Sequence, residues 1–252
     1  MKILVLSDLH NEFKVFVPPV TDVDVVVLAG DIDVKARGVA WAAEHFQCPV
    51  LYVPGNHEYY GGQLVHSLRK LREAAAKTPN VQILDRDEVI IDDVRFLGAT
   101  GWTDYTATGN APMAAIYARE LKDFKLIRTS KYGRINPNDF AQECLASKAW
   151  FREKLSEPFS GHTVGIVHHA PTTEALKGHP EAGTHLDASF ANRWEDLMGE
   201  WIDLFVHGHN HQRSEFDLYG TRVVSNQRGY PGEMINFDPG FIVDTDTFRK
   251  KA

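Results

Sequence analysis

Short, uninterrupted runs of apolar residues recur along the first part of the chain, and each run ends at polar residues. Runs of Val, Ile and Leu of this length are typical of strands that are buried on both faces. They occupy residues 2–6, 24–28 and 50–53. Stretches with helical spacing follow the second and third runs, at residues 36–46 and 63–77. This alternation predicts the βαβαβ start of an α/β fold.

The second half of the chain predicts shorter strands with fewer helices between them. We expect strands at 88–91, 94–97, 163–167, 204–207, 213–218, 221–225 and 241–243. A helix is predicted at 136–155, because Asn136 suits the N-cap and Pro137 the first helical position. A second helix is predicted at 187–198.

Residues 100–136 have no clear long period and are rich in Gly, Thr, Asn and aromatic residues. Long irregular segments in compact domains tend to be functional. We therefore expect this segment to form a partial lid over a site.

The composition is that of a soluble globular protein, with 252 residues, 43% hydrophobic and 24% charged. No linker interrupts it, which predicts a single domain spanning residues 1–252. The net charge of −7 gives no general attraction for nucleic acid or anionic lipid. The only compact basic cluster is Arg249-Lys250-Lys251. We therefore expect neither a nucleic-acid partner nor a membrane partner.

The two cysteines, Cys48 and Cys144, form neither a disulfide framework nor a zinc-finger spacing. This usage fits a reducing compartment. The apolar start at residues 3–6 is cut by Asp8 and is too short for the core of a signal peptide. No run approaches the ~18 apolar residues of a membrane span. We expect a cytoplasmic protein.

The candidate chemistry lies where the predicted strands end. The chain has 12 histidines, and several of them follow strands together with Asp and Asn. The segments are Asp8-Leu9-His10, Gly30-Asp31, Gly55-Asn56-His57-Glu58, His168-His169 and His207-Gly208-His209-Asn210-His211. In an α/β sheet, ligands bind outside the carboxyl ends of the strands. Oxygen and imidazole donors without thiolate suit divalent or trivalent metals of hard to borderline character.

Spacing within these segments refines the hypothesis. Asp8 and His10 are two residues apart, as are His209 and His211, so at a strand end each pair should point the same way and hold one ion. A single buried His or strand-end Asp is more often a hydrogen-bonded structural residue. Five such segments together favour a metal site.

The ordered set resembles the calcineurin-like metallophosphoesterase family, whose blocks read D-x-H, G-D, G-N-H-[ED], a His before x-P, and G-H-x-H. All five blocks occur here in order, from residue 8 to residue 211. The resemblance implies a four-layer α/β/β/α sandwich that holds two metal ions. It implies that Asp8, His10, Asp31 and His211 hold one ion, and that Asp31, Asn56, His168 and His209 hold the other. Asp31 then bridges both ions, and His168 is preferred to His169 because it lies two residues before Pro171.

The resemblance also implies an activity. It predicts a metal-dependent hydrolase that cleaves phosphodiester or phosphomonoester bonds by attack of a hydroxide bridging the two metals. His57 is then the catalytic residue that is not a ligand, beside the bridging Asp31, and contacts the phosphoryl group or the leaving oxygen. We expect Glu58 or Asp8 to orient its ring. The ligands suit Mn, Fe and Zn alike, so the metal identity stays open.

Substrate contacts are expected from Tyr59, Trp102 and Arg228. The alternative for the two aromatic residues is that they fill the core, and for the arginine that it lies on the solvated surface. The partner is expected to be a small phosphoester. The family also contains protein phosphatases and nucleases, and a non-catalytic phosphate-binding or scaffold member is a further alternative, although every expected ligand and His57 are present.

Overall fold

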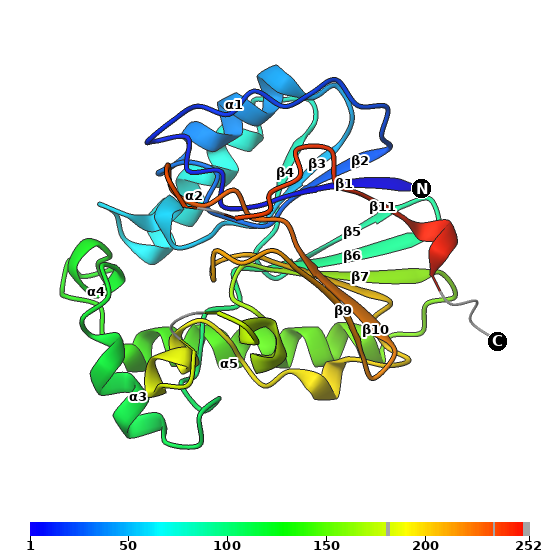
Figure 1. Cartoon of the computed structure of the whole chain (residues 1–252). Helices are drawn as coiled ribbons and strands as arrows, with labels where there is room; N and C mark the ends of the chain where they lie inside the picture. Colours follow the sequence, from blue (N-terminus) through cyan, green and yellow to red (C-terminus); the bar gives the residue numbers. More distant parts are fainter. Residues whose placement is uncertain (180–181, 234, 249–252) are drawn as a thin grey trace.

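Two β-sheets lie face to face in the computed structural model, which describes residues 1–179, 182–233 and 235–248 (Figure 1). The first sheet has the order β11 (Ile242–Asp244), β1 (Lys2–Leu6), β2 (Val25–Leu28), β3 (Val50–Tyr52) and β4 (Val81–Ile83). The second has the order β5 (Asp87–Ile91), β6 (Val94–Ala99), β7 (His162–Val167), β8 (Leu204–His207), β10 (Thr221–Ser225) and β9 (Ser214–Leu218).

Helices cover the outer face of each sheet. In Figure 1, α1 (Arg37–His45) and α2 (Leu64–Ala75) lie above the first sheet, and α5 (Pro137–Ser156) lies below the second. Two short helices, α3 (Ala111–Ala118) and α4 (Asp123–Leu126), lie to one side. Single turns of 3₁₀ helix span His57–Tyr59, Thr173–Leu176, His185–Ser189, Glu195–Leu197 and Thr245–Thr247. The predicted α/β/β/α sandwich is confirmed.

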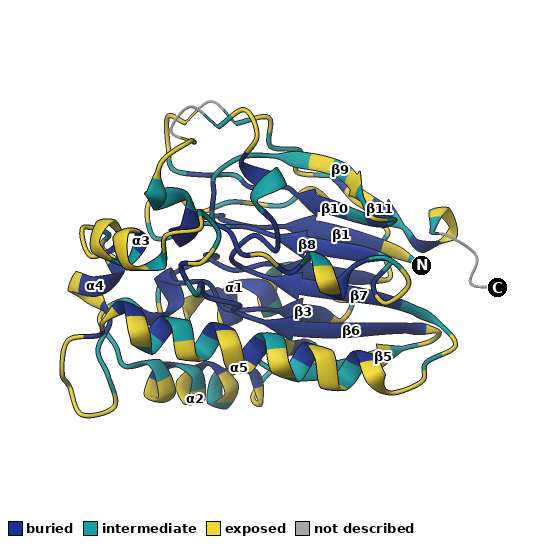
Figure 2. Ribbon diagram, turned by 90° about the horizontal axis from the view of Figure 1, so that it is seen from below, coloured by how far each residue is buried: buried dark blue, intermediate teal, exposed yellow. Residues whose placement is uncertain are grey.

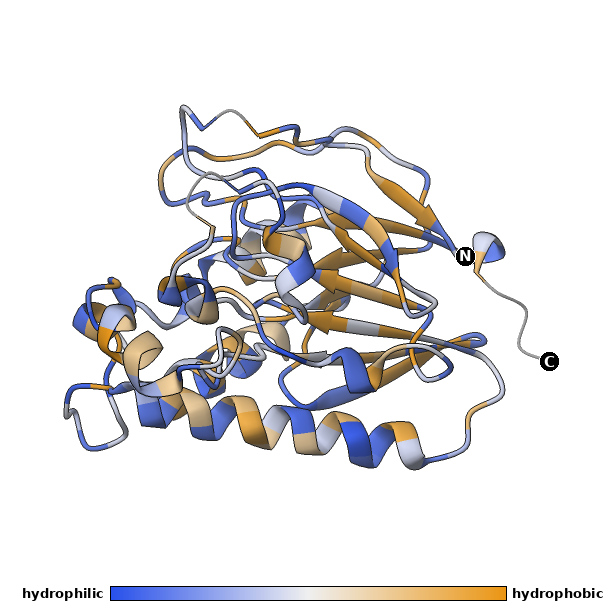
Figure 3. Cartoon of the chain, turned by 60° about the horizontal axis from the view of Figure 1, so that its bottom comes forward, coloured by the Kyte–Doolittle hydropathy of each residue, from blue (hydrophilic) through white to orange (hydrophobic). Residues whose placement is uncertain are grey.

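The strands are buried on both faces, which explains their continuous apolar sequences. Along β2, Val25 and Val27 point into the core between the sheets, whereas Val26 and Leu28 point into the core beneath α1 and α2. Figure 2 shows the central strands as buried, and Figure 3 shows them as predominantly hydrophobic. The outward face of α5 is exposed in Figure 2, which fits a helix that covers only one sheet.

The central strands are parallel within each sheet, and the antiparallel strands β11, β5 and β9 lie at sheet edges. Parallel strands deliver their carboxyl ends to one edge of a sheet. The segments after β1, β2, β3, β7 and β8 therefore lie on the same side of the molecule.

Helix α5 begins where the sequence predicts. Asn136 is its N-cap, and the Asn136 side chain and the Asp139 side chain form a reciprocal capping box. The predicted helix at 187–198 is wrong. Two single 3₁₀ turns, His185–Ser189 and Glu195–Leu197, stand there instead. Between them the chain runs beside Ala170, because Asn192 N donates to Ala170 O at 2.8 Å and Ala191 forms a bridge with Ala170.

The segment predicted to be irregular, residues 100–136, contains α3 and α4. The residues of α3 are apolar on every side of the helix, so the segment lacks the one-sided pattern that identifies a helix in a sequence.

Cys48 and Cys144 are free thiols. The basic cluster Arg249-Lys250-Lys251 lies outside the described residues. Within the described ranges, no helix combines the length and the apolar character needed to cross a membrane.

Candidate metal centre

The five strand ends bring seven candidate ligands together. Asp8 and His10 follow β1, Asp31 follows β2, Asn56 follows β3, His168 follows β7, and His209 and His211 follow β8. Five of these side chains are nearly or fully buried, and only the two histidines after β8 are half-buried. Polar groups are buried at this density only where they have partners of their own.

Several ligand candidates have left-handed backbone conformations. The φ angle is 50° at Asp8, 47° at His10, 55° at Asp31, 75° at His209 and 48° at His211. Such conformations are uncommon outside glycine and cluster at functional sites. The turns after the strands thus aim these side chains at a common point.

The left-handed turns also change one expectation. His211 lies with Asp8 and His10, whereas His209 lies with Asp31 and His168, and the ligand atoms of each group lie within 4.8 Å of one another. Spacing alone would let His209 and His211 hold one ion, but the structure places them in different groups because the backbone between them is not extended. Asp8 and His10 do share a group.

Two glycines permit the close approach of these loops. A Cβ atom on Gly30, which has φ 91°, would lie 2.8 Å from Gly55 Cα and closer still to the His168 ring. A Cβ atom on Gly55 would lie 2.7 Å from Asp31 N. No larger side chain fits at either position without moving a ligand.

In the first group, two imidazole nitrogens face each other, and carboxylates hold the opposite nitrogen of each ring. Glu12 Oε1 accepts a hydrogen bond from His10 Nδ1 at 3.0 Å, and Glu233 Oε2 accepts one from His211 Nδ1 at 2.7 Å. An ionised carboxylate only accepts, so each Nδ1 carries its ring's hydrogen. The two Nε2 atoms lie 3.0 Å apart with their lone pairs facing.

A metal ion resolves this arrangement. A cation held by both nitrogens would take the place of the hydrogen that a bond between them lacks. Burial lowers the pKa of His10 to about 4, which keeps the ring neutral as a ligand must be. The residues of this group therefore fit a metal ion.

The second group has the same character. His168 Nδ1 donates to Ala29 O at 2.8 Å, so its Nε2 presents a lone pair to Asn56 Oδ1 at 2.9 Å and Asp31 Oδ1 at 3.5 Å. His209 Nδ1 also lies 3.1 Å from Asn56 Oδ1. Burial holds the pKa values of His168 and His209 well below the usual range. Electron-rich atoms of neutral rings and oxygens converge, which suits a cation.

Asn56 is oriented by two neighbours. Its Nδ2 donates to Asp123 Oδ1 at 2.9 Å and to Tyr60 OH at 3.0 Å. The amide oxygen is thereby turned toward His168 and His209. Asp123 and Tyr60 thus set which atom of the amide faces the second group.

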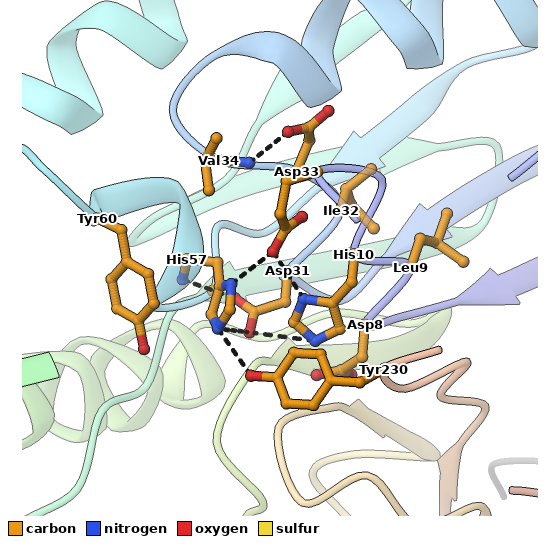
Figure 4. Close-up of polar contacts among 12 residues, drawn as sticks. Asp8, Leu9, His10, Asp31, Ile32, Asp33, Val34, His57, Tyr60 and Tyr230 are labelled. Atoms are coloured by element: carbon orange, nitrogen blue, oxygen red, sulfur yellow. Dashed lines mark hydrogen bonds and ion pairs between the residues drawn. The ribbon is translucent and has the colours of Figure 1, made fainter. Parts of the chain in front are cut away.

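Asp31 lies between the two groups. Its Oδ1 accepts from His57 N at 2.8 Å, and its Oδ2 lies 4.0 Å from His10 Nε2 (Figure 4). Its Oδ1 also lies 3.5 Å from His168 Nε2. Burial, with the nearby Glu58 and Asp8 carboxylates, raises its pKa well above the usual value. A carboxylate in such surroundings is stabilised by cations at both oxygens.

Glu58 does not orient the His57 ring as expected. Its carboxylate accepts from Gly55 N at 2.7 Å, Asp31 N at 3.0 Å and Tyr52 OH at 2.5 Å, and so ties two loops together. Asp8 accepts instead from Ser7 and from His209 N. The contact to the ring comes from Glu12, whose Oε1 lies 2.7 Å from His57 Nδ1.

Sequence reasoning missed Glu12. The signal available was its position two residues beyond His10, the same spacing that pairs Asp8 with His10. Tyr230 was also missed as a site residue. Its hydroxyl lies 3.1 Å from His57 Nε2, and its ring lies 4.4 Å from the His10 ring, centroid to centroid (Figure 4).

A cleft of about 390 Å³ opens over both groups. Its described lining combines site residues, three aromatic side chains and part of the segment 100–136. These residues are Asp31, Asn56, His57, Tyr60, Glu120, Leu121, Lys122, Asp123, His179, Phe190, His209, Asn210, His211, Tyr230 and Glu233.

The three expected substrate contacts do not reach the described lining. Tyr59 is 2% exposed and packs in the core, and Trp102 is 4% exposed and stacks on Phe140 with centroids 4.1 Å apart. Arg228 donates to Leu9 O at 2.8 Å and to Lys14 O at 2.6 Å. These expectations are corrected. Tyr59 and Trp102 face the core, Arg228 holds backbone carbonyls, and Tyr60 is the residue that faces the cleft.

His169 lies outside both groups. Its ring packs 4.1 Å from the His209 ring, and its Nδ1 lies 3.4 Å from Thr100 O. The structure thus places His168, and not His169, beside Asp31.

Comparisons with known proteins find relatives in sequence and in fold. An uncharacterised protein of Acanthamoeba polyphaga mimivirus is 24% identical over 211 residues, covering 78% of this chain and 74% of that protein. The solved structure of the phosphopantetheinyl hydrolase of Mycobacterium tuberculosis is similar with a TM-score of 0.72 and 16% identity, covering 91% of this chain and 90% of that chain. A candidate 5′-nucleotidase of Staphylococcus aureus gives a TM-score of 0.53 and 14% identity, covering 90% of this chain and 49% of that chain.

At these identities the structural likenesses show a shared fold. The sequence profile of the calcineurin-like phosphoesterases reaches further, because it matches residues 1–213 and so includes all five strand-end segments. The matched family supports a phosphoester hydrolase in general. The chain therefore belongs to the calcineurin-like phosphoesterase family.

Proposed function

We propose that the protein is a binuclear metal-dependent hydrolase that cleaves a small phosphodiester or phosphomonoester. One observation carries the proposal: the ligand atoms of Asp8, His10 and His211 lie within 4.8 Å of one another, as do those of Asp31, His168 and His209. Asp31 Oδ2 also lies 4.0 Å from His10 Nε2 of the first group, and members of both groups line one cleft. Such an arrangement is stable only around positive charge.

The first ion would be held by Asp8, His10, Asp31 and His211, and the second by Asp31, Asn56, His168 and His209. When bound, two such ions supply a nucleophile at neutral pH and offset the negative charge of a phosphoryl group. The donors are oxygens and imidazoles, so Mn, Fe and Zn all suit the site.

His57 is the proposed catalytic residue, and it is not one of the proposed metal ligands. Its Nε2 faces the cleft beside Tyr230, and its Nδ1 is held by Glu12. A ring fixed in this way can hold a proton at Nε2 and pass it to a departing oxygen.

Tyr60 and Tyr230, which line the cleft, replace Tyr59, Trp102 and Arg228 as the proposed substrate contacts.

The cleft favours a small substrate. Its volume of about 390 Å³ lies at the lower end of the usual range for small-molecule sites. Its described lining contains the acidic Glu120 and Glu233 and a single lysine, Lys122, which does not make the basic groove that a nucleic acid requires. Residues 120–123 contribute to this lining, which supports the partial lid proposed for 100–136.

The proposal is tested by metal analysis together with hydrolysis of bis-p-nitrophenyl phosphate and p-nitrophenyl phosphate in the presence of Mn²⁺. We expect about two metals per chain and turnover of at least one ester, lost on chelation and in Asp31→Asn. Hydrolysis that survives rigorous chelation would contradict it. Two bound metals without hydrolysis of either ester would favour the phosphate-binding alternative.

We also propose a cytoplasmic location. The supporting observation is that Cys48 and Cys144 are both free, as is usual in reducing compartments. Fractionation of the native cell with a thiol-specific label tests this proposal, and an extracellular pool would contradict it.

A further inference from the structure

One carboxylate oxygen joins the metal site to the catalytic histidine. Glu12 Oε1 lies 3.0 Å from His10 Nδ1 and 2.7 Å from His57 Nδ1. The two rings meet edge to face, with centroids 4.5 Å apart (Figure 4). A proposed ligand and the proposed catalytic residue therefore share a single hydrogen-bond acceptor.

The neighbours of these rings fix where the hydrogens lie. The Glu12 carboxylate lies within hydrogen-bond distance of both Nδ1 atoms. An ionised carboxylate only accepts, so each Nδ1 carries its ring's hydrogen. Each Nε2 is left without a hydrogen in the neutral ring.

Tyr230 supports the same arrangement independently. Its hydroxyl lies 3.1 Å from His57 Nε2, and a phenol at neutral pH carries a hydrogen that it can donate. A phenol that donates to His57 Nε2 requires this nitrogen to be the acceptor. The contacts on both sides of the His57 ring thus agree on one tautomer.

The Glu12 carboxylate forms ion pairs with these two rings. It is 9% exposed, and its ion pairs among the described residues are with His10 and His57. Its other oxygen, Oε2, is buried without a hydrogen-bond partner in the described part of the chain. Burying a carboxylate is costly unless it is paired.

We propose that Glu12 is a positioning residue that fixes His10 and His57 together in the Nδ1–H form, so that one carboxylate prepares a metal ligand and a proton-transfer group at once. The kinetic part of this inference rests on the proposed function, whereas its tautomer part does not. The consequence for His10 is a free Nε2 directed at the first ion. For His57, Nδ1 keeps its hydrogen in both protonation states, and the proton exchanged with substrate enters and leaves at Nε2.

The first test uses the metal-free protein. Nitrogen-15 NMR of labelled histidine distinguishes the two tautomers, with assignments from His10→Asn and His57→Asn. We expect both rings in the Nδ1–H form in the unmodified protein. In Glu12→Gln and in Glu12→Ala we expect each ring to populate both the Nδ1–H and the Nε2–H form. An Nε2–H form of either ring in the unmodified protein would overturn the proposal, whether or not the protein proves to be an enzyme.

The second test compares Glu12 with Glu233, a carboxylate that supports a proposed metal ligand but not the proposed catalytic residue. Glu233 holds His211 Nδ1 and the Tyr230 backbone N, and it does not contact His57. Removal of such outer hydrogen-bond partners typically costs about 10–100-fold in metal affinity. We expect Glu12→Gln and Glu233→Gln both to bind Mn²⁺ more weakly, by about this factor.

Only the Glu12 variant should then remain slow when metal is saturating. We expect its kcat to fall more for an alkyl phosphoester than for a p-nitrophenyl ester, because the alkoxide needs a proton more than the nitrophenolate does. Equal losses on both esters, or full turnover of Glu12→Gln at saturating metal, would overturn the role at His57. The exposed Glu44→Gln serves as a control for removing a charge.

Discussion

Each proposed metal-facing histidine of the first group, and His168 of the second, has one ring nitrogen committed to an acceptor. Glu12 takes the hydrogen of His10, Glu233 that of His211, and the Ala29 carbonyl that of His168. The remaining nitrogen of each ring is thereby directed at a metal position. Such outer partners raise the basicity of a ligand and fix its orientation.

The role of His57 is testable by its removal. We expect His57→Ala to lower kcat by about 10²–10⁴-fold, the usual contribution of general acid–base help, while bound metal measured after dialysis stays unchanged. The exposed His66→Ala is the matched control. Unchanged turnover in His57→Ala would remove this ring from the mechanism.

The close approach of the loops is testable at Gly30. A left-handed non-glycine residue costs about 1–3 kcal/mol, and Gly30→Ala adds a clash with Gly55 Cα and His168. Gly109→Ala is the matched control, because Gly109 has φ 78° and an added Cβ meets nothing within 4 Å. We expect urea unfolding to show a larger loss of stability in Gly30→Ala, together with loss of metal. Equal losses in the two variants would mean that the clash is relieved at no cost.

At the scale of elements, α4 connects the cleft lining to a proposed ligand. Asp123 begins this helix and holds the Asn56 amide, and Gly61 N donates to Leu126 O at 2.9 Å at the other end of the helix. The segment 100–136 is therefore fastened to the loop after β3. Its sequence gave no periodic signal, because short and uniformly apolar helices are defined by what they pack against.

This connection predicts an effect of Asp123 on metal binding. In Asp123→Ala the Asn56 amide loses its main acceptor, and we expect the affinity for Mn²⁺ to fall by about 10–100-fold. Tyr60→Phe is the control, since it removes one hydroxyl but leaves the Asp123 contact of 2.9 Å to Asn56. Calorimetric titration of the metal-free proteins measures both. Equal affinities in Asp123→Ala and the unmodified protein would contradict the connection.

At the scale of the whole molecule, the site joins the two sheets. Asp8, Asp31 and Asn56 follow strands of the first sheet, whereas His168 and His211 follow strands of the second. A ligand that binds both sheets binds only the folded chain. Bound metal should therefore stabilise the sandwich as a unit.

We expect chelation to lower Tm. A ligand at a hundred times its Kd adds about 2.7 kcal/mol to the free energy of unfolding, and differential scanning calorimetry with and without chelator measures the loss. The Asp31→Asn variant, which lacks the shared carboxylate, should respond less. An unchanged Tm in the unmodified protein after complete metal removal would argue against a filled site.

The apolar pattern by itself determined the parallel-strand start of an α/β fold and the positions of the five strand-end segments, whereas the four-layer sandwich was implied by the resemblance to the family. It could do so because strands buried on both faces need continuous apolar runs, as in β1 and β2, and because parallel strands place their carboxyl ends at one edge. Local cap chemistry likewise determined the start of α5 at Asn136.

The resemblance implied how the ligands divide between two ions, but only the tertiary structure shows why His209 and His211 separate and which residues support each group. The separation of His209 from His211 depends on left-handed turns that extended spacing does not predict. Glu12, Asp123 and Tyr230 become site residues through contacts with partners 45, 67 and 173 positions away along the chain. Contacts of this kind arise from folding in three dimensions, and no local pattern in the sequence records them.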